Sequence, residues 1–196
     1  MNKIRAFIAV PLSEALLDEL ATLRHRLESR VPHRSVRWVR PEGIHLTLKF
    51  LGDTPVTDVS RIEQALDVVA RYAPTFTFTT QGLGCFPNAR RPRVIWVGVQ
   101  EPSGRLAALA AAVEEAMVSL GYKAERRAFH PHLTLGRVRR RTSQRDVAQV
   151  GEVVENFEVD QLAQVVVERF ELIRSVLKPS GAEYTTWRTF ELQAEP

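Results

Sequence analysis

Hydrophobic and polar residues alternate in two segments of the chain that share the sequence His-Leu-Thr-Leu, at residues 45–48 and 132–135. This alternation is the period of a half-buried strand, in which side chains two residues apart lie on one face. The leucines are expected to enter a core, and each histidine and threonine to line a polar surface. Two copies starting at His45 and His132 predict an internally duplicated domain with one histidine of the site from each half.

The rest of the chain shows the periods of further strands and helices. Ser13 is a typical N-cap, and the leucine spacing behind it predicts a helix to about Ser29. Apolar and polar spacing predicts three more helices, over residues 58–72, 103–120 and 144–150. Strands are predicted at 3–10, 36–39, 44–51, 75–80, 94–99 and 132–138, a loop at 82–93, and a closing hairpin of 165–175 with 184–192 around the turn 178–181.

This order of elements is compatible with parallel βαβ units. The alternating strands and the expected hairpins favour antiparallel sheets instead, with helices on their outer faces. Nothing in the sequence reads as an independent linker or a low-complexity tail. We therefore expect one α+β domain over residues 1–196.

Composition narrows the class of protein. Hydrophobic residues make up 44% of the 196, which is ample for a core. A single cysteine, Cys85, excludes an internal disulfide and fits a reducing compartment, so the cytoplasm is expected. No segment approaches the ~20 apolar residues of a membrane span, and we expect no membrane partner and a monomer.

The net charge is mild, at +4, but arginines cluster at 90–93 and at 137–145. Clusters of this kind either hold a nucleic-acid backbone or form an ordinary basic surface. The second cluster begins directly after a His-Leu-Thr-Leu segment, which favours a functional role there.

Two imidazoles and two hydroxyls on facing strands suit the chemistry of a phosphodiester. A neutral histidine takes a proton from the nucleophile, and a protonated one gives a proton to the leaving oxygen. Histidine fits both roles because its unperturbed pKa lies near ~6.5. Threonine hydroxyls can donate hydrogen bonds to the non-bridging phosphate oxygens.

Metal binding is the competing use of histidines. Zinc needs three or four ligands, commonly His, Cys or carboxylate. Each motif offers threonine as its second side chain, and Cys85 lies far from both in sequence. The chemistry is therefore expected to need neither a metal nor another cofactor.

The segments HLTLKFLG (45–52), FHPHLTLGRV (129–138) and RAFIAV (5–10) resemble the two-histidine (2H) phosphoesterase superfamily. Within it they are most similar to the RNA 2′,3′-cyclic phosphodiesterases, also called 2′-5′ RNA ligase or LigT-like proteins. The resemblance implies two pseudo-symmetric lobes around an active-site cleft. It also implies hydrolysis of RNA 2′,3′-cyclic phosphate ends to 2′-phosphates, with 2′-5′ ligation as the reverse reaction.

The same resemblance assigns roles to the motif residues. His132 is the proton acceptor that activates water, and His45 is the proton donor to the departing O3′. Thr47 and Thr134 hold the phosphoryl oxygens.

Parity along the strands suggests further substrate-binding residues. Lys49 shares the parity of His45 and is expected to face the cleft, or else to be an exposed residue at the strand end. Phe50 has the opposite parity and is expected in the core. Arg137 would point away from the cleft on a flat strand, although a bulge at Gly136 could turn it back, and the resemblance favours a basic residue there.

Two other residues are candidates for contact with substrate. His130 is expected at the rim of the cleft. Phe7 matches an aromatic residue of the family's first strand, where it stacks a base or belongs to the core. His25 and His33 are expected to have no chemical role.

Two alternatives to hydrolysis of RNA ends stay open. The same chemistry could act on a small cyclic nucleotide, an ADP-ribose cyclic phosphate or a 2′-5′ oligonucleotide. The chain could also be an RNA- or nucleotide-binding module without turnover, against which the intact His and Thr of both motifs argue.

Overall fold

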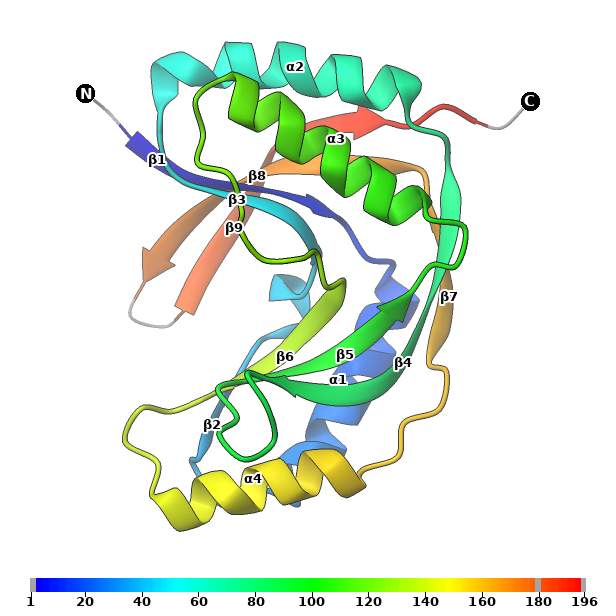
Figure 1. The fold of residues 1–196 in the computed structure, drawn as a ribbon. Helices are drawn as coiled ribbons and strands as arrows, with labels where there is room; N and C mark the ends of the chain where they lie inside the picture. The colour runs from blue at the N-terminus through cyan, green and yellow to red at the C-terminus, as the bar shows by residue number, and fades with distance from the viewer. Residues whose placement is uncertain (1–2, 179–180, 195–196) are drawn as a thin grey trace.

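The computed structural model describes residues 3–178 and 181–194 and contains two antiparallel sheets (Figure 1). The first sheet has the strand order β3-β1-β8-β9, and the second has the order β2-β6-β5-β4-β7. The strands of the first sheet are β1 (Lys3–Val10), β3 (Leu46–Pro55), β8 (Arg169–Lys178) and β9 (Gly181–Glu191). Those of the second are β2 (Val36–Trp38), β4 (Phe76–Phe86), β5 (Val94–Gln100), β6 (His132–Val138) and β7 (Ala163–Val167).

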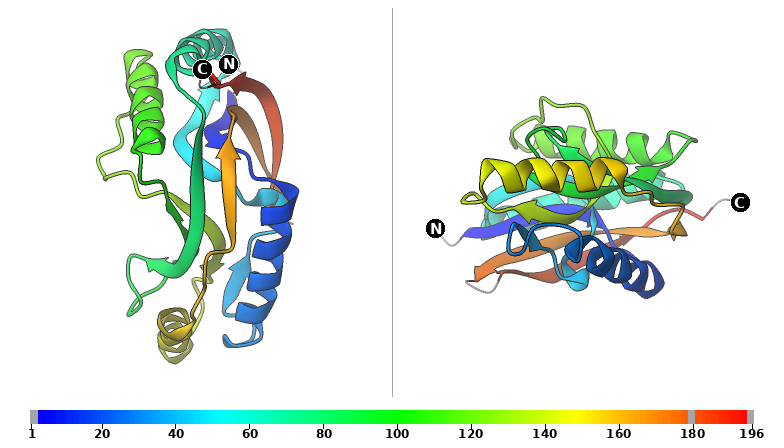
Figure 2. Two further views of the ribbon diagram at one scale, coloured as in Figure 1. Left: turned by 90° about the vertical axis from the view of Figure 1, so that its right-hand side faces the viewer. Right: turned by 90° about the horizontal axis from the view of Figure 1, so that it is seen from below.

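In the described residues, four α-helices cover the sheets: α1 (Glu14–Glu28), α2 (Val59–Tyr72), α3 (Arg105–Ser119) and α4 (Gln144–Asn156). Ser13 and Ser143 cap α1 and α4 by accepting hydrogen bonds from the backbone N–H groups of Leu16 and Asp146. In Figure 2, α2 and α3 lie at one end of the molecule and α4 at the opposite end. The result is an α+β fold of two lobes, as the sequence predicted.

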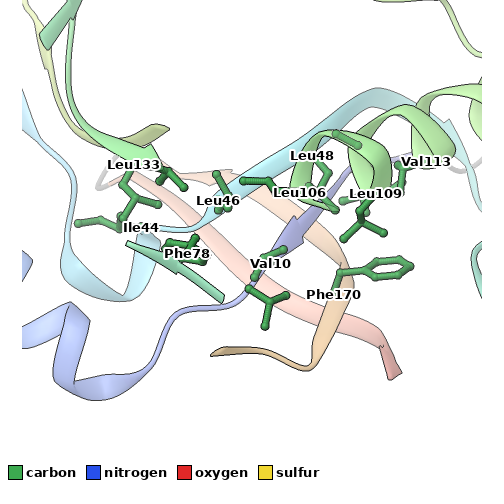
Figure 3. Close-up of a cluster of buried hydrophobic side chains, with 14 of the residues drawn as sticks. Val10, Ile44, Leu46, Leu48, Phe78, Leu106, Leu109, Val113, Leu133 and Phe170 are labelled. Atoms are coloured by element: carbon green, nitrogen blue, oxygen red, sulfur yellow. The ribbon is translucent and has the colours of Figure 1, made fainter. Parts of the chain in front are cut away.

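The main core runs through both lobes. Leu46 and Leu133, the first leucines of the two motifs, are fully buried in the same cluster (Figure 3). Leu106, Leu109 and Val113 of α3 belong to this cluster and cover the first sheet. A smaller cluster joins Val150 and Val154 of α4 to Ile95 of β5 and to Val31 and Val36, beneath the second sheet. Because the leucines of both motifs are buried, their histidines and threonines are turned to the other faces of the sheets.

The two lobes exchange strands. β2 comes from the first part of the chain but forms an edge of the second sheet, where it pairs with β6. The hairpin β8–β9 comes from the end of the chain but completes the first sheet beside β1. Each sheet therefore contains strands that are distant in the sequence (Figure 1).

Most predicted elements are confirmed, and four need correction. β4 continues to Phe86, so the first part of the predicted loop 82–93 is strand. α4 continues to Asn156 rather than ending near residue 150. The predicted strand 165–175 is two strands, β7 and β8, divided at Glu168, and the predicted start of the motif strand at residue 44 is too early. Of the expected hairpin turn, Pro179 and Ser180 lie outside the described residues.

Candidate active site

The first motif histidine is held by aromatic side chains of the first sheet. His45 stands directly before β3, and its ring stacks on that of Phe7 from β1, with centroids 4.6 Å apart and planes at 25°. Tyr184 of β9 contacts the His45 ring edge-on, with 4.9 Å between centroids. Burial against these rings lowers the pKa of His45 to about 4, because the charged form loses hydration. His45 is therefore neutral in the free protein at neutral pH.

The second motif histidine is oriented by its own chain. The Nδ1 atom of His132 lies 2.7 Å from the carbonyl oxygen of His130. A carbonyl only accepts, so Nδ1 carries the proton and Nε2 has a free lone pair in the neutral ring. Burial lowers the pKa of His132, the hydrogen bond to His130 raises it, and the charge of Arg137 lowers it further, with a net lowering. The tautomer is thus the one that a general base requires at Nε2.

The motif threonines lie on the same faces as these histidines. Thr47 pairs with Ala9 of β1, and Thr134 pairs with Trp96 of β5. Both threonines are half-buried. Within residues 3–178 and 181–194 neither hydroxyl has a hydrogen-bond partner, so both are available to a ligand.

A β-bulge in β3 overturns the predicted directions of Lys49 and Phe50. Ala9 pairs with Thr47 and Ile8 with Lys49, so Leu48 is an extra residue on β3. One extra residue reverses the alternation beyond it. Phe50 therefore shares the face of Phe7, at 6.0 Å between ring centroids, and is 68% exposed rather than in the core.

Lys49 faces the helix layer instead of the cleft. Its Nζ donates to Glu114 of α3 at 2.6 Å and to the carbonyl oxygen of Lys123 at 3.1 Å, and its side chain is buried. The second oxygen of Glu114 accepts from the backbone N–H of Glu125, in the segment between α3 and β6. Lys49 thus ties β3 to α3 and to the approach of the second motif, and its predicted orientation is wrong.

The second motif strand contains a matching bulge that turns Arg137 toward the site. Trp96 pairs with Thr134 and Ile95 with Gly136, so Leu135 is the extra residue on β6. Arg137 then pairs with Val94 and returns to the face of Thr134, as a bulge near Gly136 was expected to allow. Adding 87 to the positions of the extra residue Leu48 and of Phe50 gives Leu135 and Arg137. Equivalent bulges therefore turn an aromatic ring, Phe50, outward in one lobe and a cation, Arg137, in the other.

A pocket of about 400 Å³ opens beside His132. Its walls include Phe86, Trp96 and His130, and the rings of Phe86 and His132 meet edge-on at 4.9 Å. His130 is exposed and lines this pocket; that it contacts a substrate stays a prediction. Gly84 leaves the space that the Trp96 ring occupies, because a Cβ at this position would collide with it.

Apart from Phe7, sequence reasoning missed the aromatic residues that surround His45 and His132. The sequence predicts Tyr184 only as part of a closing strand, and Phe86 as part of a loop. The available signal was weak: Gly82 and Gly84 within an alternating run can mark a strand whose glycines make room for a ring.

The residues near the motifs offer no cage for a metal. Among residues 3–178 and 181–194, no three His, Cys, Asp or Glu side chains gather as a metal ion would need. Cys85 packs against the smaller core cluster, and burial raises the pKa of its thiol, so it is a poor nucleophile. In the same ranges no helix is both long and apolar enough to cross a membrane.

The chain has full-length relatives among known proteins. The family model described as "LigT like Phosphoesterase" matches residues 10–96 and 97–184. The chain is 36% identical to the RNA 2′,3′-cyclic phosphodiesterase of Methanothermobacter thermautotrophicus, over 97% of this chain and 100% of that protein. It is 34% identical to the protein of the same name from Archaeoglobus fulgidus, over 96% and 100%.

Solved structures show the same fold. Protein TT0787 of Thermus thermophilus superposes with a TM-score of 0.81 at 27% identity, over 98% of this chain and all of that one. E. coli LigT in complex with 3′-AMP superposes with a TM-score of 0.78 at 23% identity, over 97% and 99%. The fold, the paired motifs and these matches define an enzyme of the phosphoesterase class. Within that class the chain belongs to the LigT-like phosphoesterase family.

Proposed function

We propose that this enzyme hydrolyses RNA ends that carry a 2′,3′-cyclic phosphate, leaving a 2′-phosphate and a free 3′-hydroxyl. The names of the full-length relatives support this substrate. The observation that carries the mechanism is the pair of histidine–threonine sets, one from each lobe, with the Nε2 atom of His132 free to accept a proton.

The reaction needs one proton accepted and one donated. A water oxygen attacks the phosphorus and its proton passes to Nε2 of His132. The bond from phosphorus to O3′ breaks on the opposite side, and His45 gives its proton to O3′. The hydroxyls of Thr47 and Thr134 donate to the two non-bridging oxygens, where negative charge gathers in the transition state.

The aromatic shell of His45 determines when this acid becomes charged. With a pKa of about 4 the ring is neutral in the free enzyme. A phosphodiester anion beside the ring favours the protonated form and raises the pKa. Binding of the anionic substrate therefore favours uptake of a proton from solvent by His45, and this is the proton that His45 then gives to O3′.

The substrate supplies the phosphorus, the leaving group and the ring strain, so the proposed reaction uses no metal and no cofactor. Run in reverse with an RNA 5′-hydroxyl at the position of water, it gives a 2′-5′ linkage as a side reaction. We place the enzyme in the cytoplasm, in keeping with its single cysteine, Cys85, and we propose that it is a monomer.

We also propose that residues 1–196 form one internally duplicated domain. The double match of the family model and the equivalent bulges at Leu48 and Leu135 support a repeat. Each repeat contributes one His-x-Thr set.

A substrate with a better leaving group separates the two histidines. In a cyclic ester with sulfur in place of O3′, the thiolate leaves without being protonated. We expect His45→Ala to lose ~10²-fold or more in turnover on the oxygen ester and to recover most of this on the thio ester. His132→Ala should lose ~10²-fold or more on both. Recovery of the His132 variant alone would reverse the assigned roles.

The same assay tests the alternatives. Substrates are an oligoribonucleotide with a cyclic end, adenosine 2′,3′-cyclic phosphate and ADP-ribose cyclic phosphate, with the product ends identified. The proposal expects the oligoribonucleotide to have the highest kcat/KM and a 2′-phosphate product. Exclusive turnover of a small molecule would replace RNA as substrate, and binding without turnover of any of them would make the protein a binding module.

A further inference from the structure

Two arginines stand directly opposite each other on neighbouring strands of the second sheet. Arg37 of β2 pairs with Arg137 of β6, and Arg137 in turn pairs with Val94 of β5. Residues paired in this way point to the same face of a sheet. Arg37 therefore shares the face of Arg137 and Thr134, one strand further toward the sheet edge.

The positive charges of Arg37 and Arg137 are not neutralised by an acidic side chain among residues 3–178 and 181–194. Both side chains are exposed, and within these ranges neither makes an ion pair or a side-chain hydrogen bond. Like charges directly opposite each other destabilise a strand pair. An anion bound between the two guanidinium groups would relieve this repulsion.

A basic pocket continues from Arg37 past the sheet edge. It has a volume of about 490 Å³ and lies between the end of α1, β2 and the segment after β6. Its walls carry Arg34, Arg37, Arg139 and His33 against one carboxylate, Glu28. Arg34 holds a left-handed backbone with φ of 60°, which is rare for a residue with a side chain.

We propose that Arg37 and Arg137 clamp a phosphodiester of the RNA strand whose cyclic end occupies the site, and that this strand leaves through the basic pocket. The inference rests on the proposed function. A cyclic end has RNA on its 5′ side only, so one exit path is needed. From Thr134 toward the sheet edge, Arg137, Arg37 and the basic pocket follow one another, and each of these three carries positive charge.

The clamp makes Arg37 a determinant of substrate length rather than of chemistry. A mononucleoside cyclic phosphate has no second phosphate for Arg37 to hold. An oligoribonucleotide has one, and an arginine–phosphate contact is worth ~10-fold or more in affinity. Selectivity for RNA over small cyclic nucleotides would then originate at an edge strand of three residues.

The test compares Arg37→Ala with Arg71→Ala, an exposed arginine of α2 in the other lobe. On adenosine 2′,3′-cyclic phosphate both variants should match the wild type. On a short oligoribonucleotide with a cyclic end, Arg37→Ala should raise KM by ~10-fold with kcat unchanged, and its plot of log affinity against log salt should be shallower by about 0.7. Its melting temperature should equal or exceed that of the wild type, because a like-charge pair has been removed.

Fluorescence anisotropy with the 2′-phosphate product oligoribonucleotide measures the clamp without catalysis. Weaker binding by the Arg37 variant alone supports it even if the enzyme proves to hydrolyse another ester, in which case only the proposed function fails. Equal losses on the mononucleoside and the oligoribonucleotide would show that Arg37 serves the reacting phosphate, and unchanged binding of the oligoribonucleotide would show that it serves neither. Either result overturns the clamp.

Discussion

Replacing His45 by phenylalanine isolates the cost of burying an ionisable ring. Phenylalanine keeps an aromatic ring on Phe7 and beside Tyr184, where centroids lie 4.6 and 4.9 Å from that of His45, but it cannot take up a proton. The variant is inactive under the proposed mechanism, and the measured quantity is its free energy of unfolding.

The sign follows from the two pKa values. Unfolded His45 titrates near 6.5, and folded His45 near 4. Above pH 6.5 both states are neutral and the stability is fully present. As pH falls toward 4, His45 binds a proton in the unfolded chain but not in the folded protein, so stability is lost. Because of this one group, the free energy of unfolding is lower at pH 4.5 than at pH 7.5 by ~2.5 kcal/mol.

The assay is urea unfolding of wild type and His45→Phe at pH 7.5 and at pH 4.5. Carboxylates titrate alike in both proteins, so their contribution cancels in the difference. We expect the stability of the variant relative to wild type to rise by ~2.5 kcal/mol on acidification. An unchanged difference between the two proteins would refute the reasoning, because His45 would then titrate in the folded state much as it does in the unfolded chain.

Four further outcomes test the site. The pH profile of kcat/KM should be bell-shaped with its maximum below 6.5, since the pKa values of His45 and His132 are both lowered; a maximum well above pH 7 would contradict this. The Thr47→Val and Thr134→Val variants should lose ~10-fold or more in turnover relative to the serine variants, which keep the hydroxyl donor, whereas equal rates would leave the hydroxyls without a role. Incubation with a strong chelator followed by its removal should leave hydrolysis intact, and activity restored by zinc or manganese would show a missed metal. Glu114→Gln should destabilise the fold by ~3 kcal/mol, because it leaves the buried ammonium of Lys49 without a countercharge. Lys49→Met should cost less, because the carboxylate that it leaves unpaired, that of Glu114, is partly exposed; urea unfolding measures both.

The sequence predicted the parts of the fold that local periodicity controls. Leu46 and Leu133 are buried as their alternation required, and the antiparallel pairing and the helical faces followed from similar patterns. Predictions failed where pairing with a distant strand decides the geometry. Between the pairs Ala9–Thr47 and Ile8–Lys49, β3 has one residue more than β1, and this bulge at Leu48 reverses Lys49 and Phe50.

The strand boundary at Glu168 shows the same limit. Residues 165–175 contain no glycine or proline to mark a boundary, but β7 ends on β4 in the second sheet and β8 begins beside β1 in the first. Likewise nothing local marks Arg37 as the neighbour of Arg137, since their pairing joins positions 100 residues apart. The side chains that line the site beyond the two motifs were therefore beyond sequence reasoning, apart from Phe7, His130 and Arg137.

The exchange of strands between the lobes has a mechanical consequence. The segment 39–44 joins β2 of the second sheet to His45, directly before β3 of the first, and Glu168 joins β7 of the second sheet to β8 of the first, so the chain passes between the sheets through short links. Spreading the lobes would strain these short crossings or strip β2 from β6. Because His45 lies at the end of one of these links, they limit how far the two motif histidines can move apart. We therefore expect the spacing of the two motif histidines to be set before a substrate binds, and each sheet to lose a strand if the other lobe unfolds.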